Sequence, residues 1–82
     1  MRRLLKAEYL RRLAQYRRLD RMLGQKYGMT FEEFVADRVV QEQGYTWEVE
    51  KDAMDWETAV GGIQTMKRKL RELRGLEGVQ RD

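Results

Sequence analysis

The sequence predicts an all-α protein of three helices, a long N-terminal helix, a short middle helix and a long C-terminal helix, arranged as an elongated hairpin or bundle. Two long stretches carry apolar side chains at the three- and four-residue spacing of amphipathic helices. Glycines and capping residues separate the helical stretches, and the chain contains no proline. We therefore expect a single helical domain over residues 1–74 and a frayed tail over residues 75–82.

The first helix is predicted to run from about residue 3 to Tyr27. Gly28 follows it and can adopt the left-handed backbone conformation that ends helices. The helix should be roughly 35 Å long, at about 1.5 Å per residue. Its apolar stripe consists of Leu5, Tyr9, Leu13, Tyr16, Leu19, Leu23 and Tyr27.

The middle helix is predicted to run from Phe31 to about Gln43. Thr30 can cap its first turn, and Glu33 lies at the reciprocal position of a capping box. Gly44 is expected to end the helix.

The last helix is predicted to run from Trp47, capped by Thr46, to about Arg74. The adjacent Gly61 and Gly62 cost about 2 kcal/mol relative to two alanines in a helix interior. They either kink or split the helix, or let another segment approach its backbone closely. The predicted buried face consists of Val49, Ala53, Trp56, Val60, Ile63 and Leu70.

The composition excludes several kinds of catalytic chemistry. The chain has no histidine and no cysteine, and its sequence contains no serine. Nucleophile–histidine systems and thiolate metal sites are therefore excluded. A short helical chain also offers little concave volume for a substrate. We expect no enzymatic activity, no cofactor and no metal site.

An acidic run at the start of the last helix raises the question of a hard cation. Glu48, Asp52 and Asp55 share one helical face. A single helix rarely supplies enough oxygen ligands for Ca²⁺ or Mg²⁺, and the spacing is not that of an EF-hand loop. We expect a solvated acidic surface, or one complementary to a basic partner.

Neither a secretion signal nor a membrane span is recognisable. The first residues are basic, but no apolar segment follows them. No apolar run approaches the roughly 20 residues that cross a bilayer. We therefore expect a cytoplasmic protein without a membrane partner.

The net charge of +3 hides three blocks of opposite sign. Residues 1–29 carry nine basic and two acidic side chains, residues 30–57 two basic and nine acidic, and residues 58–82 six basic and three acidic. The blocks thus carry +7, −7 and +3. This pattern suggests that the ends and the middle meet different surfaces, or each other.

The last helix has a second uncharged stripe, nearly opposite its predicted buried face. A helix on the outside of a small bundle normally carries charge there. Either the middle helix covers this stripe within the same chain, or a partner or a second copy of the chain does. The stripe consists of Trp47, Met54, Thr58, Gly61 and Thr65.

The polar surface of the first helix is rich in arginine. Such a surface could bind phosphates, with a steep dependence on salt. However, the sequence has no helix-turn-helix, zinc-finger or basic-zipper pattern and no basic–aromatic alternation of the kind that stacks bases. Pairing with the acidic middle of the same chain is the alternative. The arginines are Arg2, Arg3, Arg11, Arg12, Arg17, Arg18 and Arg21.

Two segments resemble the small antitoxin-type proteins of prokaryotic toxin–antitoxin modules. They are Lys-Tyr-Gly-Met-Thr-Phe-Glu-Glu-Phe at residues 26–34, and Gly-Tyr-Thr-Trp-Glu-Val-Glu with a following Asp-Trp-Glu within residues 44–57. The resemblance covers about residues 20–73. It implies a protein that wraps and neutralises a partner toxin, often a nuclease. The toxin-facing residues that it implies are Tyr45, Trp47, Glu48, Glu50, Asp55, Trp56 and Glu57.

The residues and the resemblance together favour a non-enzymatic protein-interaction module, most simply an antitoxin that binds a basic toxin encoded nearby. An acidic surface suits a basic partner because complementary potentials speed encounter. The alternatives are a nucleic-acid-associated regulator that uses the arginines of the first helix, and a self-associating structural dimer. For Tyr45, Trp47 and Trp56, packing in a small core is the ordinary alternative to partner binding. The predicted partner-binding residues are Tyr45, Trp47, Glu48, Glu50, Met54, Asp55, Trp56, Glu57, Thr58, Gly61 and Thr65.

Overall fold

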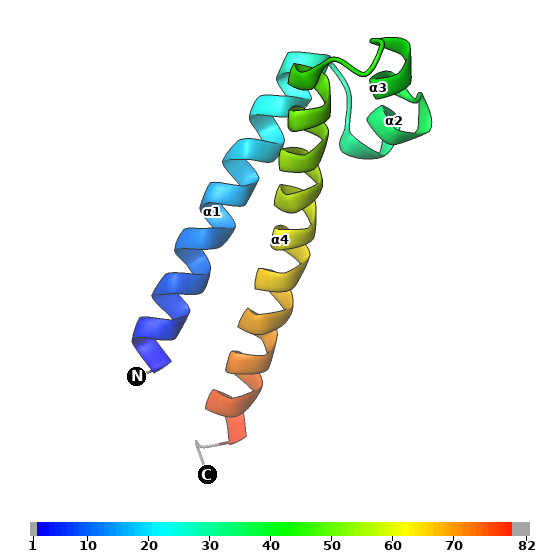
Figure 1. Cartoon of the computed structure of the whole chain (residues 1–82). Helices are drawn as coiled ribbons and strands as arrows, with labels where there is room; N and C mark the ends of the chain where they lie inside the picture. The colour runs from blue at the N-terminus through cyan, green and yellow to red at the C-terminus, as the bar shows by residue number, and fades with distance from the viewer. Residues whose placement is uncertain (1, 80–82) are drawn as a thin grey trace.

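The structure is a computed structural model that describes the backbone of residues 2–79 and the side chains of residues 3–75. In chain order its helices are α1 (Arg2–Tyr27), α2 (Phe31–Ala36), α3 (Val39–Glu42) and α4 (Trp47–Val79). The long helices α1 and α4 pack side by side as an antiparallel hairpin, and the short helices α2 and α3 protrude from one side of it (Figure 1). The molecule measures 58 × 20 × 17 Å. The predicted all-α, elongated hairpin is therefore confirmed.

The hairpin has a closed end, an open end and a protruding knob. The closed end is where α1 leads into α2 and where α4 begins. The open end is where the start of α1 and the last turns of α4 lie (Figure 1). The knob is the pair of short helices α2 and α3, residues 31–42.

The predicted boundary between the first two helices is confirmed. Gly28 has a φ of 67°, in the left-handed region that suits glycine at the end of a helix. The backbone N–H of Met29 donates to the carbonyl oxygen of Gly24 at 3.2 Å. Thr30 and Glu33 then form the capping box, with hydrogen bonds of 3.2 and 3.1 Å between each backbone N–H and the other side chain.

The predicted continuous middle helix is wrong, because the chain breaks it between α2 and α3. Arg38 has a φ of 52°, a left-handed conformation that costs roughly 1–2 kcal/mol for a residue with a Cβ. Phe34 and Val39 are both buried, yet in one helix they would point about 140° apart at 3.6 residues per turn. The reversal at Arg38 lets both side chains reach the same core.

The last helix is continuous through Gly61 and Gly62 and extends to Val79, beyond the predicted end near Arg74. Its N-terminus is capped as predicted, since the N–H of Val49 donates to the side-chain oxygen of Thr46 at 3.4 Å. Residues 75–79 of the predicted tail are helical, and residues 80–82 lie outside the described part of the chain.

The two glycines of α4 have different surroundings. A Cβ on Gly62 would lie 2.6 Å from Cδ2 and 2.7 Å from Cζ of Tyr16 on α1, so this glycine lets the tyrosine ring rest on the backbone of α4. A Cβ on Gly61 would have no atom within 4 Å. Close packing, rather than a kink, is therefore the role of Gly62.

Two clusters of buried side chains hold the hairpin together. The closed-end core joins α1, the knob and α4 through Leu23, Phe34, Val39, Val49 and Trp56. The second cluster lies between α1 and α4 toward the open end and consists of Leu13, Ile63 and Met66, with Tyr9, Tyr16 and Leu70 packed against it. The predicted buried faces of the two long helices therefore meet, except at Leu5 of the predicted stripe, which is 46% exposed.

Alanine substitutions at the two glycines should change stability in opposite directions. Gly61→Ala should raise the free energy of unfolding by about 1 kcal/mol, because it removes the helix-propensity penalty of glycine. Gly62→Ala brings the same gain but forces Tyr16 out of its place, and overpacking of this kind costs about 1–3 kcal/mol. Urea unfolding followed by circular dichroism measures both. Equal stabilisation by the two substitutions would show that Tyr16 does not rest on Gly62.

Candidate protein-interaction surface

Trp56 lies in the core and not on the partner-binding surface, where the sequence analysis placed it. Its side chain is fully buried, with ring centroids 5.0 Å from Phe34 and 5.5 Å from Phe31. Its indole N–H donates to Oδ1 of Asp20 at 2.7 Å, so the one polar atom of the ring is satisfied without water. The alternative of an aromatic core residue is the correct one for this tryptophan.

The second uncharged stripe of α4 is exposed. Trp47 is 69% exposed and Met54 is 52% exposed. The knob packs instead against Ala53 and Val60, on another side of the helix. Thr58 and Gly61 are also exposed and Thr65 is half-buried. The middle of the chain therefore does not cover this stripe, and we call Trp47, Met54, Thr58, Gly61 and Thr65 the outer stripe.

Acidic side chains flank the outer stripe at the closed end. Glu48 is paired with Lys26 at 2.8 Å and Asp55 with Lys51 at 2.8 Å. Among the described side chains, Glu50 and Glu57 make no ion pair. The first two carboxylates are thus partly neutralised, and the last two leave negative charge beside the stripe.

The remaining predicted partner residue, Tyr45, follows the knob. It is exposed and has a φ of 56°. Its N–H donates to the carbonyl oxygen of Val40 at 3.0 Å, which ties the turn after α3 to the knob.

A network of three side chains joins α1 to α4 at the closed end. The Oδ2 atom of Asp52 accepts hydrogen bonds from Nζ of Lys26 and from the hydroxyl of Tyr27, both at 2.6 Å. Burial opposes ionisation of Asp52, but these hydrogen bonds outweigh it and hold the pKa of its carboxyl below the ordinary 3.8. Burial and the hydrogen bond to Asp52 together raise the pKa of Tyr27 to about 12. The hydrogen bonds to Asp52 and Glu48 also raise the pKa of Lys26.

The described arginines of α1 are exposed as predicted, but the fold adds basic residues that the sequence analysis did not connect with them. Antiparallel packing brings the C-terminal part of α4 beside the N-terminal part of α1 (Figure 1). The exposed arginines are Arg3, Arg11, Arg12, Arg17, Arg18 and Arg21, and the side chain of Arg2 lies outside the described part. The basic residues that α4 contributes are Lys67, Arg68, Lys69, Arg71 and Arg74.

The three charge blocks of the sequence therefore become two ends in the structure. The open half, residues 3–18 and 65–75, carries eleven basic and two acidic side chains, a net charge of +9. The closed half, residues 19–64, carries four basic and ten acidic side chains, a net charge of −6.

The ion pairs described in the open half lie within single helices. They join Glu8 to Arg11 and Arg12, and Arg68 to Glu72. The alternative that these arginines pair with the acidic middle of the chain is therefore not seen among the described side chains.

The described part of the chain contains no group of three or more acidic, histidine or cysteine side chains that could hold a metal ion. None of its helices has both the length and the apolar character needed to cross a bilayer.

Comparison of the chain with models of known protein families, with curated proteins and with solved structures finds no match. The resemblance to antitoxins therefore depends on the two sequence segments that carry it.

The network around Asp52 predicts how stability depends on pH. The pKa of Asp52 is lowered on folding, so its contribution is present above pH 4 and is lost as the pH falls through the folded value. The pKa of Tyr27 is raised from 10.0 to about 12, so its contribution is present below pH 10 and is lost between pH 10 and about 12. Thermal unfolding across this range should show both losses.

Two substitutions assign these losses to the residues. Asp52→Asn should flatten the acid limb of the stability–pH curve. Tyr27→Phe should flatten part of the alkaline limb, to which the raised pKa of Lys26 also contributes. Asp37→Asn and Tyr45→Phe, at exposed positions, serve as matched controls. The interpretation would be rejected if a control flattened its limb as much as the substitution in the network.

Proposed function

We propose that the chain is a non-enzymatic protein-interaction module that docks a basic protein partner along the outer stripe of α4. The observation that carries this proposal is the exposure of that stripe, in which Trp47 and Met54 are each more than half exposed. Uncharged residues on the outer face of a helix leave apolar surface in water, and a partner would remove it.

The composition of the outer stripe supports docking of another protein. Tryptophan is enriched among the residues that carry most of the binding energy at interfaces. Gly61 has open space above it, so a partner backbone can approach α4 closely at this point. From Trp47 to Thr65 the stripe extends over about 27 Å, at 1.5 Å per residue, which suits a helix of a partner laid along α4.

The charge around the stripe favours a basic partner over an acidic one. The closed half has a net charge of −6. That charge includes Glu50 and Glu57 beside the stripe, which make no ion pair among the described side chains. A basic partner would be drawn to this end at rates that fall with increasing salt. The apolar stripe would then supply the affinity that salt does not weaken.

Neutralisation of a toxin is the specific form of this function that the resemblance implies. An RNA-cleaving toxin is expected to be basic, and it would match the acidic end of the hairpin. Co-expression tests this form directly: the chain should suppress the toxicity of a protein encoded beside it. Undiminished toxicity would reject the antitoxin role and leave the docking proposal to be decided by binding.

Arginine substitutions in the outer stripe should weaken partner binding strongly and leave the hairpin folded. Wild-type protein captured from its native lysate should retain a stoichiometric basic protein, whose affinity is then titrated in purified form. Met54→Arg and Gly61→Arg should each weaken binding at least about 30-fold, the loss expected for a binding hot spot of about 2 kcal/mol.

Gln15→Arg is the matched control, because it adds the same charge at an exposed position of α1, away from the stripe. It should bind as the wild type does. Circular dichroism should show the same helix content in all four proteins. Loss of helix in the two stripe variants, or undiminished binding by them, would contradict the proposal.

A further inference from the structure

One face of α4 changes character along its length. Ala53, Val60, Lys67 and Arg74 follow one another at seven-residue intervals, so they lie on the same side of the helix. The knob covers the first two, which pack against the closed-end core. Beyond the knob, none of the described helices covers this face (Figure 1).

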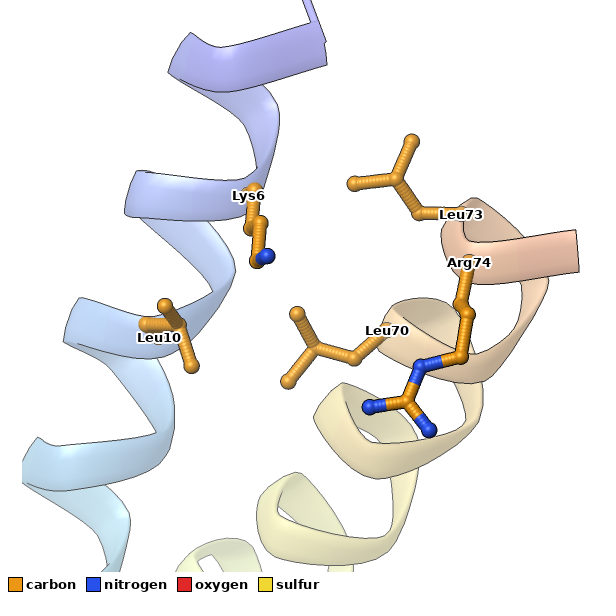
Figure 2. Close-up of a pocket in the computed structure, with 5 residues that line it drawn as sticks. All are labelled: Lys6, Leu10, Leu70, Leu73 and Arg74. Atoms are coloured by element: carbon orange, nitrogen blue, oxygen red, sulfur yellow. The ribbon is translucent and has the colours of Figure 1, made fainter. Parts of the chain in front are cut away.

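At the open end the continuation of this face forms a groove between α1 and α4. Lys6 and Leu10 from α1 face Leu70, Leu73 and Arg74 from α4 around a hollow of about 140 Å³ (Figure 2). Leu10 is 47% exposed. The groove therefore has an apolar floor of leucines and a basic side chain on each rim, and we call these five residues the basic groove.

The knob has the complementary character. Val35 projects from it and is 57% exposed. The segment that contains the knob, residues 30–46, carries four acidic side chains and one basic side chain, for a net charge of −3. An exposed apolar residue among carboxylates is the counterpart of an apolar groove between basic residues.

We propose that two copies of this chain associate antiparallel, so that the knob of each copy covers the basic groove of the other. The arrangement has two-fold symmetry, and the knob–groove contact is therefore made twice. It sets the open half of one copy, at +9, beside the closed half of the other, at −6. In one molecule the knob protrudes at the closed end, and no described helix lies beside α4 farther along (Figure 1). In the dimer, the knob of the second molecule occupies that space.

The long side of the molecule has room for an interface of standard size. A standard interface buries about 800 Å² on each partner. One side of the hairpin measures 58 × 20 Å, which exceeds this requirement. A small core without disulfides also gains from such an association, because a chain of this length buries little apolar surface alone.

The groove favours a second copy over a nucleic acid. Phosphates are bound through charge and hydrogen bonds, so a floor of leucines adds nothing to phosphate binding. Bases stack on aromatic rings, and the five groove residues include none. The knob matches both parts of the groove: its carboxylates can pair with the basic rim, and its exposed valine can pack on the leucine floor.

The dimer face and the outer stripe lie on different sides of α4. Met54 and Arg74 point about 160° apart around the helix, at 3.6 residues per turn. A dimer therefore leaves both outer stripes accessible, and its test does not depend on the proposed function. Gly61→Arg should leave the dimer intact.

Charge reversal and sedimentation equilibrium test the dimer. At high micromolar concentration and low salt, the protein should have twice the monomer mass of 9.9 kDa, and added salt should promote dissociation. Reversing the groove rims (Lys6→Glu with Arg74→Glu) should raise the dissociation constant at least tenfold. So should reversing the knob (Glu32→Lys with Asp37→Lys). The two reversals combined should restore association.

Arg18→Glu is the control for these reversals. It makes one charge reversal in the open half, half the change of the groove variant, on a side of α1 about 120° from Lys6. The dissociation constant of this variant should rise only by the small amount that the altered net charge causes, and much less than that of the groove variant. A monomer at every concentration would overturn the proposal, and so would failure of the combined reversals to restore the dimer. A wild-type monomer that binds single- or double-stranded DNA or RNA would assign the groove to nucleic acid instead.

The distance between spin labels on the two copies tests whether they are antiparallel in the dimer. The chain has no cysteine, so Gln41→Cys on the knob gives one attachment site per copy. In the antiparallel dimer the two labels are separated by about the distance from knob to groove along the hairpin, ~30 Å from Ala53 to Arg74 at 1.5 Å per residue. A short label-to-label distance would place the two closed ends together and would overturn the antiparallel arrangement.

Discussion

Trp56 is the side chain on which the arrangement of the four helices depends. It projects from α4 into the centre of the closed-end core, where it touches the knob through Phe31 and Phe34. It is hydrogen-bonded to α1 through Asp20. A large aromatic side chain buries roughly 150–250 Å² of surface. Two helices packed as a hairpin bury only the narrow strip between them, so this side chain adds a large share of the core. The hydrogen bond to Asp20 gives the ring one orientation, which fixes the side of the hairpin on which the knob sits.

The position of the knob decides which surfaces remain uncovered. Because the knob packs on Ala53 and Val60, it leaves the outer stripe of α4 in solvent. Because it is short, it leaves the same face of the hairpin open beyond Val60. The position of the knob at the closed end thus determines that both the outer stripe and the basic groove are uncovered. The charges around the two surfaces differ. The outer stripe lies among carboxylates, whereas the basic groove lies among lysine and arginine side chains.

The sequence predicts the parts of this fold that are governed by local rules. The periodicity of α1 and α4, the capping box at Thr30 and Glu33, and the buried faces of both long helices depend on neighbouring residues. The structure contains all of them, except that Leu5 of the predicted stripe is exposed. The break at Arg38 was not predictable in this way, since a left-handed arginine has no propensity signal. Only the gain from burying Phe34 and Val39 together explains it.

The candidate site was predicted less well, for a similar reason. Trp47 and Trp56 are both tryptophans in an acidic segment, and only tertiary packing buries one and exposes the other. The helical wheel did place Trp56 on the buried face, and that signal was the better guide to its role. The basic end was missed because it is assembled from two segments that are distant in sequence. Antiparallel packing of α1 and α4 would have indicated it.

The distribution of charge connects the stability of the hairpin to its binding partners. At the closed end, Lys26 of α1 is paired with Asp52 of α4, so attraction joins the two helices there. At the open end both helices are basic, and the described ion pairs lie within each helix. Leu13, Ile63, Met66 and the Tyr16–Gly62 contact must hold the helices together against this repulsion. Salt screens the repulsion over about 10 Å at 0.1 M. An acidic surface bound at the open end would remove this repulsion more fully. Because such a partner binds the folded chain and not the unfolded one, its binding free energy also stabilises the hairpin.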